Sequence, residues 1–163
     1  MVTCRCWLGG EILVPKEKLS HRPSAYGIVQ RDDTVLLMTT VGVNGRYCLP
    51  GGGIEPYETN AAAVQRELLE EAGIQVEVGP LVHFQEDFFY YDPTGDAWHG
   101  LLFYYRCTPL SFDLLPAALV DDESATNPQW VKIDTLRQDH LQPQEQWLLD
   151  YLKEHRTYAL TNL

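Results

Sequence analysis

The sequence predicts a domain of the α/β or α+β class, in which helices pack on a mixed β-sheet. Short runs rich in apolar and β-branched residues alternate with polar turns along most of the chain, and this pattern is typical of strands. Two further segments instead carry apolar residues at helical spacing. The 163 residues suit one domain with a substantial core, so residues 1–163 are expected to form a single domain.

The first elements are expected to be a pair of strands at 24–30 and 35–40. The polar segment 31–33 separates them and predicts a turn. The Asn-Gly pair at 44–45 marks a second turn, and another short segment follows it at 46–49.

The segment from Thr59 to Ala72 is expected to be the best-defined helix. Its apolar residues recur every three or four positions and form one stripe, at Ala61, Val64, Leu68 and Ala72. Thr59 suits the N-cap position, and Gly73 suits the position after the last turn. The sequence therefore marks both ends of this helix.

A long hairpin rich in aromatic residues is expected next. After a short strand at 75–78, the segments 82–91 and 98–107 flank a type I turn with Pro93 at its second position. We expect a loop with short helical turns at 114–128 and a last short strand at 130–133. The segment 143–154 predicts a second helix, because its large apolar residues fall on one side and a proline occupies its first position.

The charge balance restricts the partners that the protein can bind. Twelve lysines and arginines against 23 aspartates and glutamates give a net charge of −11. Such a chain repels polyanions, so neither DNA nor RNA is an expected partner. An N-terminal signal segment and an apolar stretch of about 20 residues are both missing, so the sequence predicts a cytoplasmic protein with no membrane partner.

Four cysteines occur without the spacing of a paired zinc site, and we expect them to be reduced thiols. Cys4 and Cys6 stand close enough in sequence to bind a metal together. Two ligands are too few for a structural site unless histidines join them.

Three acidic residues near the end of the predicted helix form the strongest chemical signal. Glu67, Glu70 and Glu71 lie at positions i, i+3 and i+4, so their carboxylates share one helix face. Negative charge is unfavourable in the last turns of a helix, and the three acids also repel one another. A divalent cation explains the cluster, and the all-oxygen ligand set favours Mg²⁺, with Mn²⁺ as a substitute.

A glycine triplet, Gly51, Gly52 and Gly53, precedes this helix. Residues without a Cβ permit a tight turn with positive φ, and they bring backbone amides and carbonyls close to the helix. A phosphate-bearing ligand can bind so acidic a protein where a metal ion lies between the phosphate and the carboxylates. We expect the glycine triplet to lie beside that metal ion.

From Gly52 to Ile74 the sequence resembles the Nudix box, G-x5-E-x7-R-E-U-x-E-E-x-G-U, where U is a bulky aliphatic residue. Every defined position matches, namely Gly52, Glu58, Arg66, Glu67, Leu68, Glu70, Glu71, Gly73 and Ile74. The resemblance implies an α/β/α sandwich with a mixed β-sheet and a catalytic loop-helix-loop. It is expected to extend over about 24–136.

The resemblance also implies Mg²⁺-dependent hydrolysis of a nucleoside diphosphate linked to another group. By similarity, Glu67, Glu70 and Glu71 would hold the metal, with the Gly51 carbonyl as a further ligand. Arg66 would orient Glu67, and Glu58 would support the junction of loop and helix. Family members differ in the general base, which is either a glutamate of the box or an acid in a loop before the last strand; Glu123 is the best candidate for that loop acid, followed by Asp122.

The sequence says less about the group that is linked to the nucleoside diphosphate. Tyr90 and Tyr91 follow the box at an offset that tends to accompany diadenosine polyphosphate hydrolases, whereas a proline near that offset, here Pro93, tends to accompany ADP-ribose hydrolases. Aromatic residues of the hairpin, including Trp98, offer a stacking surface for a base. Core packing explains the same aromatic residues equally well.

Two other functions are compatible with the sequence. One is a nucleotide-sensing module that has lost turnover. The other is an isoprenoid diphosphate isomerase, which would need a reactive cysteine such as Cys48. The sequence also leaves open whether the chain is a monomer or a homodimer.

Overall fold

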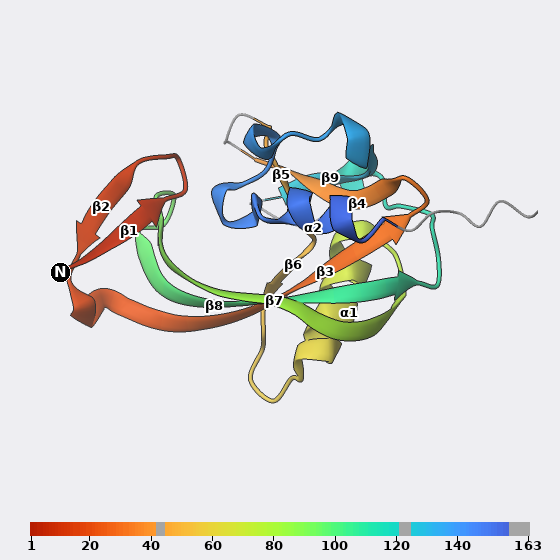
Figure 1. Ribbon diagram of the computed structural model, residues 1–163. Helices are drawn as coiled ribbons and strands as arrows, with labels where there is room; N and C mark the ends of the chain where they lie inside the picture. Colours follow the sequence, from red (N-terminus) through yellow and green to blue (C-terminus); the bar gives the residue numbers. More distant parts are fainter. Residues whose placement is uncertain (42–44, 121–124, 157–163) are drawn as a thin grey trace, which may run out of the picture.

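The computed structural model describes residues 1–41, 45–120 and 125–156. Its centre is a curved mixed sheet with the strand order β2-β1-β7-β8-β3-β4-β5, to which β6 adds beside β3 and β9 beside β4 (Figure 1). The strands are β1 Val2–Cys6, β2 Glu11–Val14, β3 Leu19–Arg31, β4 Thr34–Thr40, β5 Tyr47–Cys48, β6 Gly51–Gly53, β7 Val76–Tyr91, β8 Asp96–Pro109 and β9 Ala125–Lys132. The α-helices are α1 Asn60–Ala72 and α2 Leu148–Glu154, and short 3₁₀ turns lie at Lys16–Lys18, Ala117–Leu119, Ile133–Thr135, Gln138–His140 and Pro143–Glu145.

Helices cover both faces of this sheet. Successive residues of β3 and of β4 point to opposite sides, because side chains alternate along a strand. Ile28 and Leu37 pack in one buried cluster with residues of α2, whereas Val29 and Leu36 pack in a second cluster with residues of α1. The predicted α/β/α sandwich with a mixed sheet is therefore confirmed.

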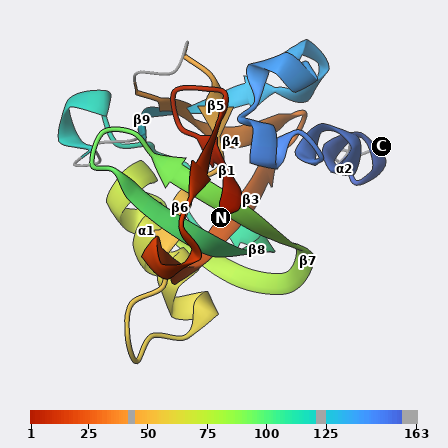
Figure 2. The same cartoon turned by 90° about the vertical axis from the view of Figure 1, so that its left-hand side faces the viewer.

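Three long strands extend beyond the two helical layers. β3 pairs with β8 in parallel from Leu19↔Ala97 to Val29↔Cys107, and β7 pairs with β8 in antiparallel fashion. Their far ends carry the β1–β2 hairpin, at the left of Figure 1. Figure 2 views the molecule from this end and shows β1 beside β7, in agreement with the pairing of Arg5 with Phe89.

The structure departs from the predicted elements at several places. β3 begins at Leu19 rather than at residue 24, and the glycine triplet forms strand β6, with positive φ at Gly51 alone. The β1–β2 hairpin was not predicted, because its strands are short and most of β2 is exposed. The predicted strands at 75–78 and 82–91 are one strand, β7, which stays paired through two register shifts. β9 begins well before the predicted last strand, and the predicted helix 143–154 is a 3₁₀ turn followed by α2.

The Asn44 half of the predicted Asn-Gly turn lies outside the described residues. The four cysteines form no disulfide with one another, as expected of thiols. Cys4 is fully buried beside Val14 and Ala97, so it packs as a small apolar side chain. No helix among residues 1–41, 45–120 and 125–156 is long and apolar enough to span a bilayer.

Helix α1 has the ends that its sequence predicts. The Thr59 hydroxyl accepts a hydrogen bond from the Ala62 N–H at 3.2 Å. Gly73 adopts a left-handed conformation with φ 76°, and its N–H bonds to carbonyls of the last turn. Leu68, which is fully buried, packs directly on the backbone of Gly27, where an added Cβ would lie 2.6 Å from Leu68 Cδ1.

A buried acid anchors the loop that leads into β6. Glu145 is 1% exposed, and its two carboxylate oxygens accept the N–H of Leu49 at 3.2 and 3.1 Å. Burial raises the pKa of Glu145 from 4.5 to about 8. At neutral pH this carboxyl group is therefore largely protonated in the folded protein.

We expect Leu68→Ala to lower the free energy of unfolding by about 2–5 kcal/mol, because it leaves a cavity between α1 and β3. The neighbouring Leu69 is 50% exposed, so Leu69→Ala is the matched control and should change stability by less than about 0.5 kcal/mol. Urea unfolding followed by circular dichroism measures both values. Equal losses in the two variants would contradict the packing described above.

We expect Glu145 to make the protein less stable as the pH rises from about 4.5 to about 8. In this window the folded state retains a proton that the unfolded chain has released, so its contribution to stability falls with pH. Glu145→Gln removes the titration while keeping an acceptor for Leu49. Denaturant unfolding at pH 5.5 and 8.5 should show a smaller decrease for the variant than for the wild type, and equal decreases would refute the assignment.

Candidate active site

The C-terminal half of α1 lies against β6, and a hydrogen bond to a buried carboxylate helps to join them. Glu71, which is 5% exposed, accepts the N–H of Gly51 at 2.7 Å. Gly51 has φ 141°, and a Cβ there would lie 2.4 Å from the carbonyl oxygen of Ala25. Only glycine fits this position without displacing β3.

The next glycine faces a second acid of the helix. A Cβ added to Gly52 would lie 2.9 Å from Glu67 Oε1. The Glu67 carboxylate therefore rests against bare backbone. Together, Gly51 and Gly52 allow two carboxylates of α1 to approach β6 more closely than side chains would permit.

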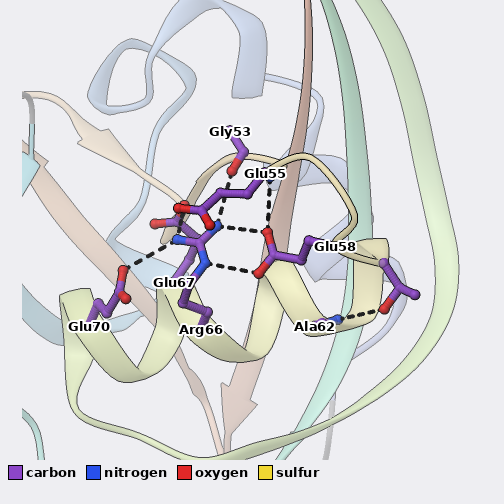
Figure 3. A network of polar contacts seen from close by, with 8 residues as sticks. Gly53, Glu55, Glu58, Ala62, Arg66, Glu67 and Glu70 are labelled. Carbon is purple, nitrogen blue, oxygen red and sulfur yellow. Dashed lines mark hydrogen bonds and ion pairs between the residues drawn. The ribbon is translucent and has the colours of Figure 1, made fainter.

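Arg66 links the loop before α1 to the acids of the helix (Figure 3). Its guanidinium donates to both oxygens of Glu58, from Nε at 2.9 Å and Nη2 at 3.0 Å. Nη1 donates to Glu67 Oε1 at 2.9 Å and to Glu70 Oε2 at 3.3 Å, while Nη2 also reaches the Gly53 carbonyl at 3.1 Å. One cation thus holds three carboxylates and a backbone oxygen.

These contacts shift the pKa values of Arg66 and Glu58. Hydrogen bonding to Glu58 is the main cause that raises the pKa of Arg66 above its ordinary value. Hydrogen bonding to Arg66 lowers the pKa of Glu58, which also accepts the Glu55 N–H at 3.0 Å. Both groups are charged at neutral pH, as a forked ion pair requires.

The donor chemistry around β6 fits a hard divalent cation. Glu67, Glu70 and Glu71 offer only oxygen, and the first two lie on the helix side that Arg66 organises. In the part of the chain that the structure describes, no three acidic, cysteine or histidine side chains already converge on one point. Glu70 is the outermost of the acids, since 60% of its side chain is exposed.

A cavity of about 320 Å³ opens beside β6. It is lined by Gly51, Gly52, Gly53 and Glu67 and by the aromatic residues Trp7, Phe89, Tyr91 and Trp98. Gly53 pairs with Ser24 of β3, whereas Trp98 lies beside Ser20, so the two groups occupy different ends of the cavity along β3. Arg5, Arg22 and Asp87 supply charged side chains between and around these groups. The cavity thus joins the glycine strand to an aromatic surface.

The structure brings together most, but not all, of the residues that the sequence singled out. Tyr91 and Trp98 line the cavity. Tyr90 points to the other face of β7, where it packs against the cluster of Cys4, Val14 and Ala97, so the structure does not bring it to the cavity.

Three other candidates are not placed at the site. Glu123 and Asp122 lie outside the described residues. Cys48 does not line the cavity.

Several lining residues were missed by the sequence analysis. Arg22 and Asp87 lie on long strands, two residues from other lining positions, so the alternation of β3 and β7 was the signal that could have found them. Arg5 and Trp7 belong to the unpredicted β1–β2 hairpin and the turn after β1. Nothing in the local sequence indicated that this segment reaches the cavity.

Comparison with known proteins connects this geometry to a family. A family model described as NUDIX domain matches residues 20–152. A MutT-like protein from Streptomyces ambofaciens is 44% identical over 70 residues, which are 41% of this chain and 46% of that protein. Human diphosphoinositol polyphosphate phosphohydrolase 3-alpha is 42% identical over 53 residues, 32% of each chain. The alignments thus span less than half the length of these relatives.

Solved structures agree with this match. A NUDIX hydrolase from Nitrosomonas europaea has 25% identity and a TM-score of 0.64, over 88% of this chain and 96% of that chain. A MutT NUDIX hydrolase from Burkholderia pseudomallei has 24% identity and a TM-score of 0.63, over 80% and 97% of the two chains, which shows a shared fold. With the family model matching most of its residues and the box complete from Gly52 in β6 to Ile74 after α1, this chain belongs to the Nudix family.

Proposed function

We propose that this protein hydrolyses a phosphoanhydride bond in a nucleoside diphosphate linked to another group, and that it requires Mg²⁺. The observation that carries this proposal is the cavity beside β6, where Glu67 and the glycines lie at one end and aromatic side chains at the other. An anhydride at the first end and a nucleoside at the second would fit such a cavity. Membership of the Nudix family supports the same chemistry.

Glu67, Glu70 and Glu71 would hold the metal, with the Gly51 carbonyl as a further ligand, and Mn²⁺ would substitute for Mg²⁺. When bound, the ion supplies positive charge that neutralises phosphate oxygens and lowers the pKa of a coordinated water. Arg66 cannot supply this positive charge, because Glu58 and Glu67 already pair with its guanidinium.

Arg66 acts on the reaction through Glu67. Its 2.9 Å hydrogen bond fixes one carboxylate oxygen, so the group keeps its orientation toward the cavity. Glu58 holds Arg66 in turn through two parallel hydrogen bonds. We therefore treat Arg66 and Glu58 as positioning residues.

The chemical step needs a water, a base and a leaving phosphate. A water attacks phosphorus in line with the departing phosphate oxygen, and the attacked phosphorus keeps the new oxygen. A carboxylate accepts the water proton, and Glu67, Glu71 and Glu123 are the candidates for it. No covalent intermediate is involved, so no serine or cysteine is required.

We expect the protein to release ¹⁸O-labelled phosphate or nucleotide when it is incubated in labelled water with Mg²⁺ and a panel of nucleotide anhydrides. The panel should contain a nucleoside triphosphate, a dinucleoside polyphosphate and ADP-ribose. Chelation of divalent cations with EDTA should abolish product formation, and added Mn²⁺ should restore it in part.

Other results would refute this proposal in distinguishable ways. Tight nucleotide binding without products would indicate a sensor. An unlabelled rearranged product from an isoprenoid diphosphate would indicate an isomerase.

We expect Glu71→Gln and Glu70→Gln each to lower kcat by about 10²-fold or more, because each replaces a proposed metal ligand with a neutral amide. Glutamine retains an oxygen that can accept the Gly51 N–H, so the fold should persist. The control is Glu77→Gln, which alters an exposed carboxylate on β7 and should leave kcat unchanged. An unchanged kcat in either test variant would remove that glutamate from the mechanism.

A further inference from the structure

The β1–β2 hairpin lies outside the segment that matches the family model, yet it reaches the proposed active site. The match begins at residue 20, whereas β1 and β2 span Val2–Cys6 and Glu11–Val14. Arg5 pairs in register with Phe89, and the Trp7 N–H donates to the Tyr90 carbonyl at 2.9 Å. Backbone pairing thus holds Arg5 and Trp7 at one wall of the cavity.

Trp7 completes a group of four aromatic rings. Trp98 lies nearly parallel to Phe89 and to Tyr91, with ring centroids 5.8 and 6.0 Å away. Trp7 meets Phe89 and Tyr91 edge-on at 6.1 and 5.9 Å. All four rings line the cavity, and together they offer a planar ligand both faces and edges to contact.

Two arginines border this aromatic group. The Arg22 guanidinium lies 4.3 Å above the Trp98 ring, and a Cβ at Gly53 would be 3.6 Å from Arg22 Nε. Arg22 therefore stands between the glycine strand and the aromatic rings. Arg5 lies 4.7 Å from the Phe89 ring and donates to Asp87 Oδ2 at 2.7 Å.

The charges of the cavity argue for one class of ligand. Arg5 is neutralised by Asp87, so Arg22 is the main cation facing the space among the described residues that line it. An inositol bearing many phosphates would need several cations and would meet a chain of net charge −11. A nucleotide needs little charge beyond the anhydride end, and its base stacks on aromatic side chains.

We propose that the β1–β2 hairpin is a base-recognition element, in which Trp7 and Arg5 complete an aromatic wall that binds the nucleobase of the substrate. The proposal deepens the function given above and rests on it for the placement of the anhydride at β6. Stacking depends on the aromatic face that every base possesses, so it tolerates both purines and pyrimidines. Asp87 and Gln144 add polar groups at the same wall.

Binding of nucleoside monophosphates to the full-length chain tests this inference without requiring turnover. By isothermal titration calorimetry, the wild type should bind AMP about tenfold or more tightly than ribose 5-phosphate, which has no base. Trp7→Ala should reduce this ratio to near one, and Trp7→Phe should preserve most of it. With a hydrolysed substrate, Trp7→Ala should raise KM by a similar factor and change kcat much less.

Leu8→Ala is the matched control, because Leu8 follows Trp7, is 62% exposed and does not line the cavity. It should bind AMP as the wild type does. An unchanged AMP to ribose 5-phosphate ratio in Trp7→Ala would overturn the inference, and so would an equal loss in Leu8→Ala. Because the calorimetry needs no product, a loss of AMP affinity in a protein that hydrolyses nothing would support base recognition while refuting the proposed function.

Discussion

The close approach of β6 to α1 is the constraint on which the rest of the site depends. It requires a strand without side chains on the helix side, and the 2.7 Å hydrogen bond from the Gly51 N–H to Glu71 helps to secure it. A charge-assisted bond to a carboxylate that is only 5% exposed is costly to break. The position of Glu67, the path of the loop before α1 and the floor of the cavity all follow from this contact.

Electrostatics explains why so many acids can share the end of one helix. Glutamates near a helix C-terminus are opposed by the helix dipole and by each other. Arg66 compensates part of this cost by bonding Glu58, Glu67 and Glu70 together. The compensation is incomplete, since one cation faces three carboxylates, and the remaining negative charge is what would attract a divalent ion.

The elements that local sequence determines were predicted well, and those that depend on distant contacts were not. Helix α1 could be placed almost to the residue, since Thr59 and Gly73 mark its ends and its apolar stripe has one period. The β1–β2 hairpin was missed because β1 joins the sheet by pairing with β7, more than 80 residues away, and neither strand has a long apolar pattern of its own. Arg5 and Trp7 were missed as cavity-lining residues for the same reason. Tyr90 and Tyr91 could not be separated from sequence alone, because their opposite orientations depend on the register of β7 in the sheet.

Because β3, β7 and β8 extend beyond the helical layers, the acidic end of the cavity and its aromatic end lie on different parts of the sheet. The glycine strand and its acids lie where α1 packs on the sheet, whereas the aromatic wall lies on strand ends that neither α1 nor α2 covers. Substitutions that do not share contacts combine nearly additively, so residues at the tip can change with little effect on the chemistry at the base. Such an arrangement makes the chain evolvable: altered side chains at positions 5 and 7 can change the ligand that binds while the glycine strand and its acids stay as they are.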